Sequence, residues 1–95
     1  MDYLLTYGYE ENEINDLIKI IPETLKNALI KEADTVKINL DCLKELGISN
    51  LKNIFNSYYD MFLMDNDEFS DIFNKYDRED LIEKLEKNIT IIEYL

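Results

Sequence analysis

Residues 43–62, LKELGISNLKNIFNSYYDMF, contain the pattern that decides the fold. Gly47 follows the last apolar residue of one helical stripe, and glycine is the usual residue just past a helix end. Ser49 or Asn50 can then cap the start of the next helix. The apolar residues that follow recur at helical spacing: Leu51, Ile54, Phe55, Tyr58 and Phe62. We therefore expect two helices joined by a turn at Gly47.

The segment before this turn, from Ala33 to Leu46, fits two patterns. Apolar and polar residues alternate from Thr35 to Cys42, which is typical of a strand. A helix also fits, because four apolar residues share one helical face: Val36, Leu40, Leu43 and Leu46. A lone strand would leave its backbone hydrogen bonds without a partner, so we expect a helix here.

Two shorter helices are expected nearer the N-terminus. From Glu10 to Ile21 the acidic residues at the start suit the positive end of a helix dipole. Pro22 cannot continue this helix but fits the first turn of a new one, so we expect a second helix that runs to about Ile30. The apolar stripe of the first helix is Ile14, Leu17, Ile18 and Ile21.

The sequence of the C-terminal third predicts two more helices, each of which begins with an acidic N-cap residue. After a short apolar connector, Met61–Met64, the pair Asp65 and Glu68 matches an acidic capping box, and Asp77 with Asp80 repeats this pattern. The expected buried faces are Phe69, Ile72, Phe73 and Tyr76 in the first helix, and Leu81, Ile82, Leu85, Ile89 and Ile92 in the second.

Composition favours one all-α domain. The 95 residues include two glycines and one proline, which offer few of the turns that β-hairpins need. The length and the apolar fraction of 46% suit a single domain that spans residues 1–95. A mean hydropathy of −0.31 and the lack of a long apolar stretch argue against a membrane protein. We expect four to six short helices.

The apolar stripes also repeat along the chain. A shift of 30 residues aligns Leu43, Leu46, Gly47, Leu51, Phe55 and Phe62 with Phe73, Tyr76, Asp77, Leu81, Leu85 and Ile92. A shift of 37 residues aligns Ile14, Leu17, Ile18, Ile21 and Leu25 with Leu51, Ile54, Phe55, Tyr58 and Phe62. These intervals predict a short helical-repeat array, in which each helical hairpin buries its apolar face on the next.

The residues of these repeats carry a family resemblance. Leu4–Tyr9, followed by Leu17-Ile18 and Pro22 and then by Leu43–Ser49, resembles the motif of the mitochondrial transcription termination factor (mTERF) family. The resemblance implies helical triplets stacked into a curved array, which in that family grips nucleic acid with a basic concave face. This chain has Tyr59 where the second repeat of the family has proline, and it is acidic where the family is basic.

Few residues offer catalytic or metal-binding chemistry. The chain has no histidine, and a single cysteine, Cys42, excludes an internal disulfide and a Cys-rich zinc site. Residues 65–71 begin like a calcium loop, but Phe69, Ser70 and Tyr76 stand where a ligand, the turn glycine and the bidentate glutamate are required. We therefore expect no enzyme activity, no cofactor and no metal site, with Cys42 as a buried structural thiol.

Charge is the most informative feature of the surface. Ten basic and 21 acidic residues give a net charge of −11, which repels nucleic acid and anionic lipid. Five carboxylates lie between Asp60 and Asp71 without a single base. A solvated surface that gives solubility is one interpretation. The sharper interpretation is a surface that imitates the phosphates of a nucleic acid and binds a basic groove.

The sequence thus favours a non-enzymatic acidic protein that inhibits a basic nucleic-acid-binding protein, as a nucleic-acid mimic of the phage or mobile-element anti-CRISPR kind. Tyr9 and Tyr59 fall outside the apolar stripes and are candidate interface anchors, whereas Tyr58 and Tyr76 lie on stripes. The predicted partner-binding residues are Tyr59, Asp65, Asp67, Glu68 and Asp71.

Two other functional classes stay open. One is a nucleic-acid-binding regulator of the mTERF-like kind, whose lysines would gather on one concave face: Lys19, Lys26, Lys31, Lys37, Lys44 and Lys52. The other is a structural subunit that forms oligomers through an apolar patch. The first residues, Met1–Leu5, lack the charge and apolar run of a secretory signal, so we expect a cytoplasmic location and no membrane partner. Nothing in the sequence fixes the oligomeric state.

Overall fold

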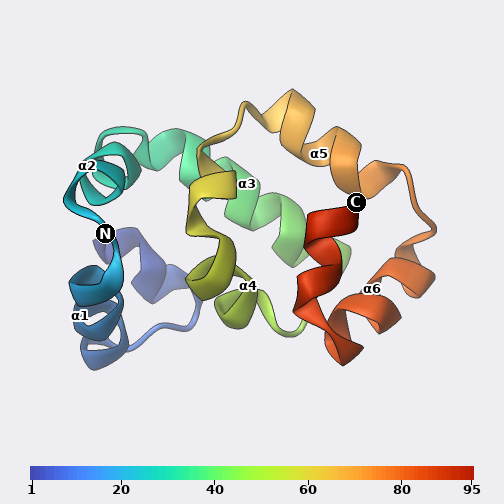
Figure 1. Ribbon diagram of the computed structural model, residues 1–95, viewed down its shortest axis with the longest axis horizontal. Helices are drawn as coiled ribbons and strands as arrows, with labels where there is room; N and C mark the ends of the chain where they lie inside the picture. The colour runs from blue at the N-terminus through green and yellow to red at the C-terminus, as the bar shows by residue number, and fades with distance from the viewer.

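The computed structural model describes residues 1–95 and contains helices but no strand. Six α-helices and three short 3-10 helices (η) fill a body of 34 × 24 × 22 Å (Figure 1). In chain order they are η1 Asp2–Tyr7, α1 Glu11–Ile20, α2 Glu23–Lys31, α3 Ala33–Leu46, α4 Leu51–Tyr58, η2 Tyr59–Leu63, α5 Asn66–Asn74, α6 Arg78–Lys87 and η3 Ile89–Tyr94.

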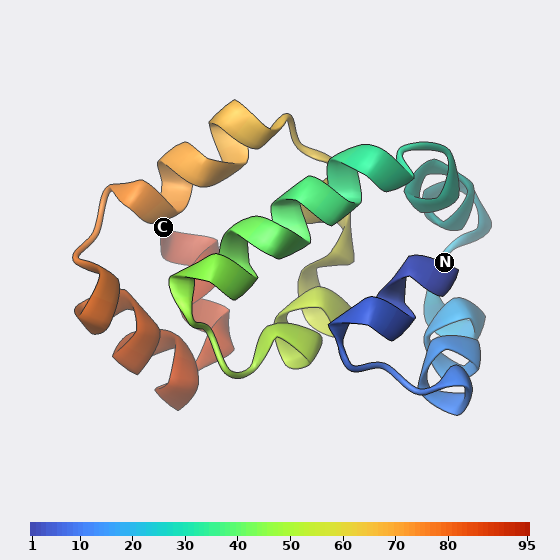
Figure 2. The same cartoon turned by 180° about the vertical axis from the view of Figure 1, so that it is seen from behind.

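The longest helix, α3, crosses the middle of the molecule between α5 and α4 (Figure 2). It includes the ambiguous stretch Thr35–Cys42, so the prediction of a helix there is confirmed. Gly47 ends it with φ of 86°, a left-handed conformation that costs other residues far more than glycine. The backbone N–H of Ile48 then donates to the carbonyl of Leu43, which completes the turn predicted from the glycine.

Two predicted helices are shorter than expected, because each changes to a 3-10 helix. The helix predicted for residues 51–62 leaves the α-conformation at Tyr58, where φ is −132°, and η2 follows. The last helix stops at Asn88, which has φ of −160° and whose side chain accepts from the backbone N–H of Thr90. The residues before Tyr9, for which the sequence predicted no helix, form η1.

Of the two acidic N-caps predicted for α5 and α6, one forms its hydrogen bond and the other does not. Asp77 accepts a hydrogen bond from the N–H of Asp80 at 3.4 Å, as predicted. Asp65 occupies the N-cap of α5 but makes no capping bond, so the predicted capping box with Glu68 is wrong. The capping box of the chain instead joins Glu10 and Glu13 at the start of α1. Asp65 therefore keeps its carboxylate free.

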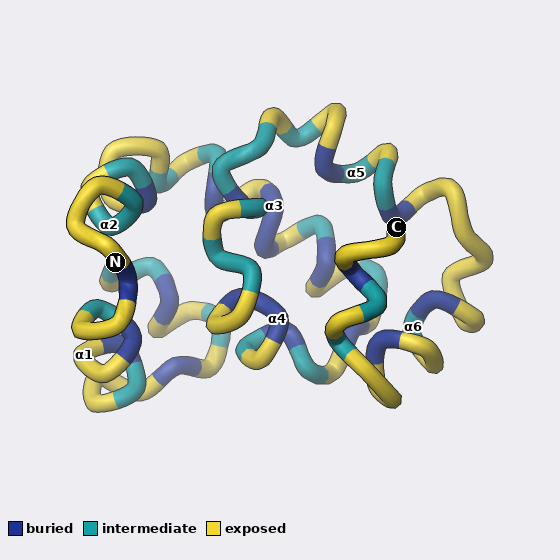
Figure 3. The backbone as a smooth tube through the Cα atoms, in the orientation of Figure 1, coloured by how far each residue is buried: buried dark blue, intermediate teal, exposed yellow.

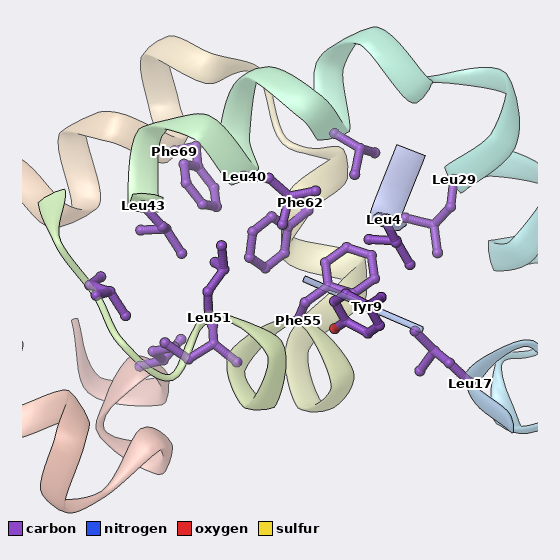
Figure 4. Packing of buried hydrophobic residues seen from close by; sticks show 14 of the residues in the cluster. Leu4, Tyr9, Leu17, Leu29, Leu40, Leu43, Leu51, Phe55, Phe62 and Phe69 are labelled. Carbon is purple, nitrogen blue, oxygen red and sulfur yellow. The ribbon is translucent and has the colours of Figure 1, made fainter. Parts of the chain in front are cut away.

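One cluster of 19 buried side chains forms the core, and its members come from every helix (Figure 3). Five of them form an aromatic row, in which successive ring centroids are 5.0 to 6.3 Å apart: Tyr9, Phe55, Phe62, Phe69 and Phe73. Figure 4 shows the rings of Phe55 and Phe62 between α3 and α4, with Leu40 and Leu51 beside them. The packing of these tilted rings holds the two halves of the chain together.

Asn39 is the buried polar residue of this core, and it is fully inaccessible. Its Nδ2 donates to the carbonyl oxygens of Phe62 at 2.9 Å and Met64 at 2.8 Å. Its Oδ1 accepts from Nδ2 of Asn66 at 3.1 Å. One amide of α3 therefore fixes both the end of η2 and the start of α5, since buried carbonyls that lack a donor are costly.

The order of the helices repeats along the chain, at about the 30-residue interval at which the apolar stripes repeat. The order α-helix, α-helix, 3-10 helix occurs as α3, α4 and η2, and again as α5, α6 and η3. In the 30-residue alignment the pairs Leu43 with Phe73, Phe55 with Leu85 and Phe62 with Ile92 are buried in both copies. The pair Leu46 with Tyr76 is not, because Tyr76 is 37% exposed and its assignment to the core is wrong.

Asn39→Ala tests the importance of the buried amide. Two buried carbonyls and the Asn66 amide lose their partner, so we expect the free energy of unfolding to fall by about 3 kcal/mol. Urea denaturation followed by circular dichroism measures the change. Asn27→Ala, on the exposed side of α2, is the matched control and should change it by less than about 0.5 kcal/mol. Equal effects of the two substitutions would contradict this role of Asn39.

Candidate binding surface

The candidate surface lies on α5, whose orientation is set by its buried side. Phe69 and Phe73 enter the aromatic row, and Asn66 is bonded to Asn39 on α3. Residues 67, 68 and 71 lie on the opposite side of the helix, because successive residues turn by about 100°. The side chains of the acidic face, defined as Asp65, Asp67, Glu68 and Asp71, are all exposed.

The carboxylates of the acidic face have no partner within the protein. The four ion pairs of the chain lie elsewhere: Lys26–Glu23, Lys52–Glu13, Lys84–Asp80 and Lys87–Glu83. Helix α5 itself contains no basic residue. The structure therefore brings four of the five predicted site residues together as one uncompensated negative surface.

The average linear charge density of the acidic face is close to that of one nucleic acid strand. Asp71 follows Asp65 by six positions, which corresponds to about 9 Å along a helix axis. The acidic face thus has about one charge per 3 Å, and one strand of DNA has one per about 3.4 Å. A short length of backbone phosphate and this helix face present similar linear charge densities.

The acids of α6, in contrast, are largely engaged within the protein. Asp80 and Glu83 are in ion pairs, Asp77 caps the helix, and Glu86 accepts from the hydroxyl of Ser49 at 3.0 Å. Glu79 is exposed and unpaired. The ten acidic residues between Asp60 and Glu86, which look alike in the sequence, therefore differ in their availability.

The tyrosines differ in how far they are exposed, and the sequence did not predict which of them are buried. Tyr9 is only 5% exposed, and its hydroxyl bonds to the carbonyl of Lys52 and to Oδ1 of Asn56, so its prediction as an interface anchor is wrong. Tyr59 lies in η2, with its ring packed against the core and its hydroxyl without a hydrogen-bond partner. It is not part of the acidic face. Tyr76, which follows α5, and Tyr94, which is 84% exposed, are better placed for a partner.

The Cys42 thiol is half-buried rather than fully buried as the sequence predicted. Burial raises the pKa of the Cys42 thiol, and the Glu45 carboxylate raises it further, so the thiolate is disfavoured. No group of three or more His, Cys, Asp or Glu side chains is arranged to hold a metal ion.

No helix of this chain is both long enough and apolar enough to cross a lipid bilayer.

The lysines of the alternative regulator are spread over α1, α2, α3 and α4. Lys26 and Lys52 are bound to Glu23 and Glu13, and Lys44 lies 5.7 Å above the ring of Tyr7. Two of the six positive charges are therefore compensated.

A scan against protein-family models, a search of curated proteins and a search of solved structures each found no match to this chain.

The Glu13–Lys52 ion pair predicts how the stability of the fold depends on pH. The Lys52 ammonium, together with the backbone N–H of Glu10, lowers the pKa of the Glu13 carboxyl. A lowered carboxyl pKa stabilises the fold above its unfolded value of about 4.5, and this contribution is lost as the pH falls through the folded pKa. Lys52→Gln should therefore raise the pKa of Glu13 in an NMR titration. The control is Lys26→Gln, which breaks the separate ion pair with Glu23 and should leave the pKa of Glu13 unchanged. If Lys52→Gln also left the pKa of Glu13 unchanged, Lys52 would not be the cause of its lowered pKa.

Proposed function

We propose that this chain is a non-enzymatic binding protein whose acidic face occupies the basic nucleic-acid-binding groove of a partner protein. The observation that carries the proposal is a set of four exposed carboxylates within seven residues, one at the N-cap of α5 and three on the helix, with no basic residue among them and no ion pair. A partner with a row of Lys or Arg side chains would supply the missing charges and displace its own nucleic acid.

Fixed geometry supports this proposal. The acidic face sits on a helix that is held to η2 by the contact of Phe69 with Phe62 and to α3 by the hydrogen bond from Asn66 to Asn39, so its backbone has a fixed orientation without a partner. A prearranged surface loses less conformational freedom on binding than a flexible acidic tail. The net charge of −11 would also speed association with a basic protein at low salt. Inhibition of a host defence protein, as in the anti-CRISPR class, is the biological setting that we propose.

The mTERF-like regulator is the second candidate. The repeated order of two α-helices and a 3-10 helix favours it, since helical triplets are what that resemblance implies. The paired lysines and the net charge favour the inhibitor instead, because a nucleic-acid-binding face needs unpaired positive charge.

A structural subunit that forms oligomers is the third candidate. It is favoured by large apolar side chains that stay 46 to 68% exposed on four elements: Leu5, Ile20, Ile30 and Ile38. Sedimentation at several concentrations separates this candidate from the other two, which need no self-association.

Neutralisation of the acidic face tests the proposal. The variant with Asp65→Asn, Asp67→Asn, Glu68→Gln and Asp71→Asn removes four charges. If each contributes about 0.5 kcal/mol at a partner groove, the affinity for a captured partner should fall about 30-fold. The partner is first captured at about 0.1 M salt and identified; a fluorescent DNA or RNA oligonucleotide bound to it then reports displacement.

The control variant changes the same net charge elsewhere, with Glu11→Gln, Asp16→Asn, Glu32→Gln and Asp34→Asn, all of which are exposed. It should retain at least a third of the affinity. A partner that binds both variants equally, or that holds its oligonucleotide and this protein together, would refute the nucleic-acid mimic while leaving the fold intact.

A further inference from the structure

The last two helices of the chain, α6 and η3, lie outside both of the networks that order the core. The aromatic row ends at Phe73 on α5, and the hydrogen bonds of Asn39 reach only residues 62, 64 and 66. Residues 78–94, which we call the C-terminal strap, follow after the short link of residues 75–77 and lie at the opposite end of the molecule from α1 and α2 (Figure 1). Neither network therefore holds the strap in place.

The polar contacts of the strap are confined to one segment. All its hydrogen bonds to residues 1–74 are made with residues 45–58, and α6 forms its two ion pairs within itself. Donor first, these hydrogen bonds are Arg78 to the carbonyls of Glu45 and Leu46, Ser49 to Glu86, Asn50 to the carbonyl of Leu85, and Tyr58 to Glu93. All except the bond from Asn50 are exposed, so water can replace them at low cost.

The apolar contacts of the strap are few. Three of its side chains are buried: Leu81, Leu85 and Ile92. Their burial favours the closed position seen in the structure, since each returns to water if the strap moves away. The half-buried bond from Nδ2 of Asn50 to the carbonyl of Leu85, at 2.9 Å, is the polar contact that adds most to it.

Asn50 makes this bond instead of capping its own helix. It is the N-cap residue of α4, where an Asn side chain commonly accepts a hydrogen bond from one of the first amides of the helix, yet no such bond is present. Its Oδ1 is buried and has no hydrogen-bond partner. Without the strap, the side chain can rotate so that Oδ1 accepts from the N–H of Lys52 or Asn53. One side chain thus has two alternative uses.

We propose that the C-terminal strap opens and closes over residues 45–58 as one unit, and that Asn50 moves its hydrogen bond from Leu85 to the first amides of α4 when the strap opens. The new cap offsets the loss of the bond to Leu85, and water takes over the exposed bonds. The open form presents the three apolar side chains that the closed form buries. No residue of the acidic face takes part in these hydrogen bonds, so this inference does not rest on the proposed function.

Native-state hydrogen exchange of the intact protein in low urea, followed by ¹H–¹⁵N NMR, tests the opening. The amides of Leu81, Leu85 and Asn88 should share one free energy of opening and one urea dependence, both smaller than those of Leu40 and Leu43 in α3. If both groups exchange through the same global unfolding, the strap does not open by itself. If the three strap amides have unrelated free energies, the helix frays and does not move as a unit. Either result overturns the proposal.

Asn50→Asp tests the two uses of this side chain, because aspartate keeps the oxygen that caps a helix and lacks the donor to Leu85. The strap amides should exchange about tenfold faster, the effect of one lost hydrogen bond, and the amide of Ile54 in α4 no faster. Asn53→Asp, an exposed change of the same charge in the first turn of α4, is the matched control and should leave the strap unchanged. Equal effects of the two variants on the strap, or equal acceleration of α4 and the strap by Asn50→Asp, would overturn the role of Asn50.

Discussion

The buried amide of Asn39 is the interaction on which the rest of the structure depends. It serves the carbonyls of Phe62 and Met64 and the side chain of Asn66, so one residue of α3 fixes both the end of η2 and the start of α5. An apolar residue at this position would leave the buried carbonyl of Phe62 and the half-buried groups of Met64 and Asn66 without this partner, at a total cost of about 3 kcal/mol. The amide thus specifies where η2 ends and how α5 begins.

The aromatic row extends this constraint across the molecule. Phe62 follows the segment that Asn39 holds, and its ring lies 5.0 Å from Phe55 on α4 and 5.2 Å from Phe69 on α5. Since Phe69 and Phe73 must enter this row, α5 has to turn Asp67, Glu68 and Asp71 outward. The outward position of the acidic face is therefore a consequence of core packing.

Helical periodicity predicted most of the fold, because the core stripes of α1, α3 and α4 follow the spacing of an α-helix and Gly47 ends α3 as expected. It failed at Tyr58 and at Asn88, since a change to a 3-10 helix preserves the apolar spacing and leaves no mark in the pattern. Asn39 was hidden because a polar residue between apolar ones resembles an exposed position. The acids of α5 could be located from the sequence, but their lack of partners could not, because an ion pair depends on which helices meet. Tyr9 was misplaced for a related reason: its hydroxyl finds acceptors on α4, 43 and 47 residues away.

We propose that α5 is the part of this protein that meets its partner. Hydrogen exchange of the complex with the captured protein, compared with the free chain, tests that claim without any substitution. If α5 meets the partner, the backbone amides from Asp65 to Asn74 should exchange more slowly in the complex, whereas those of α1 and α2 should be unchanged. Protection that appears on α1, α2 or the exposed apolar residues while α5 exchanges as in the free protein would contradict it.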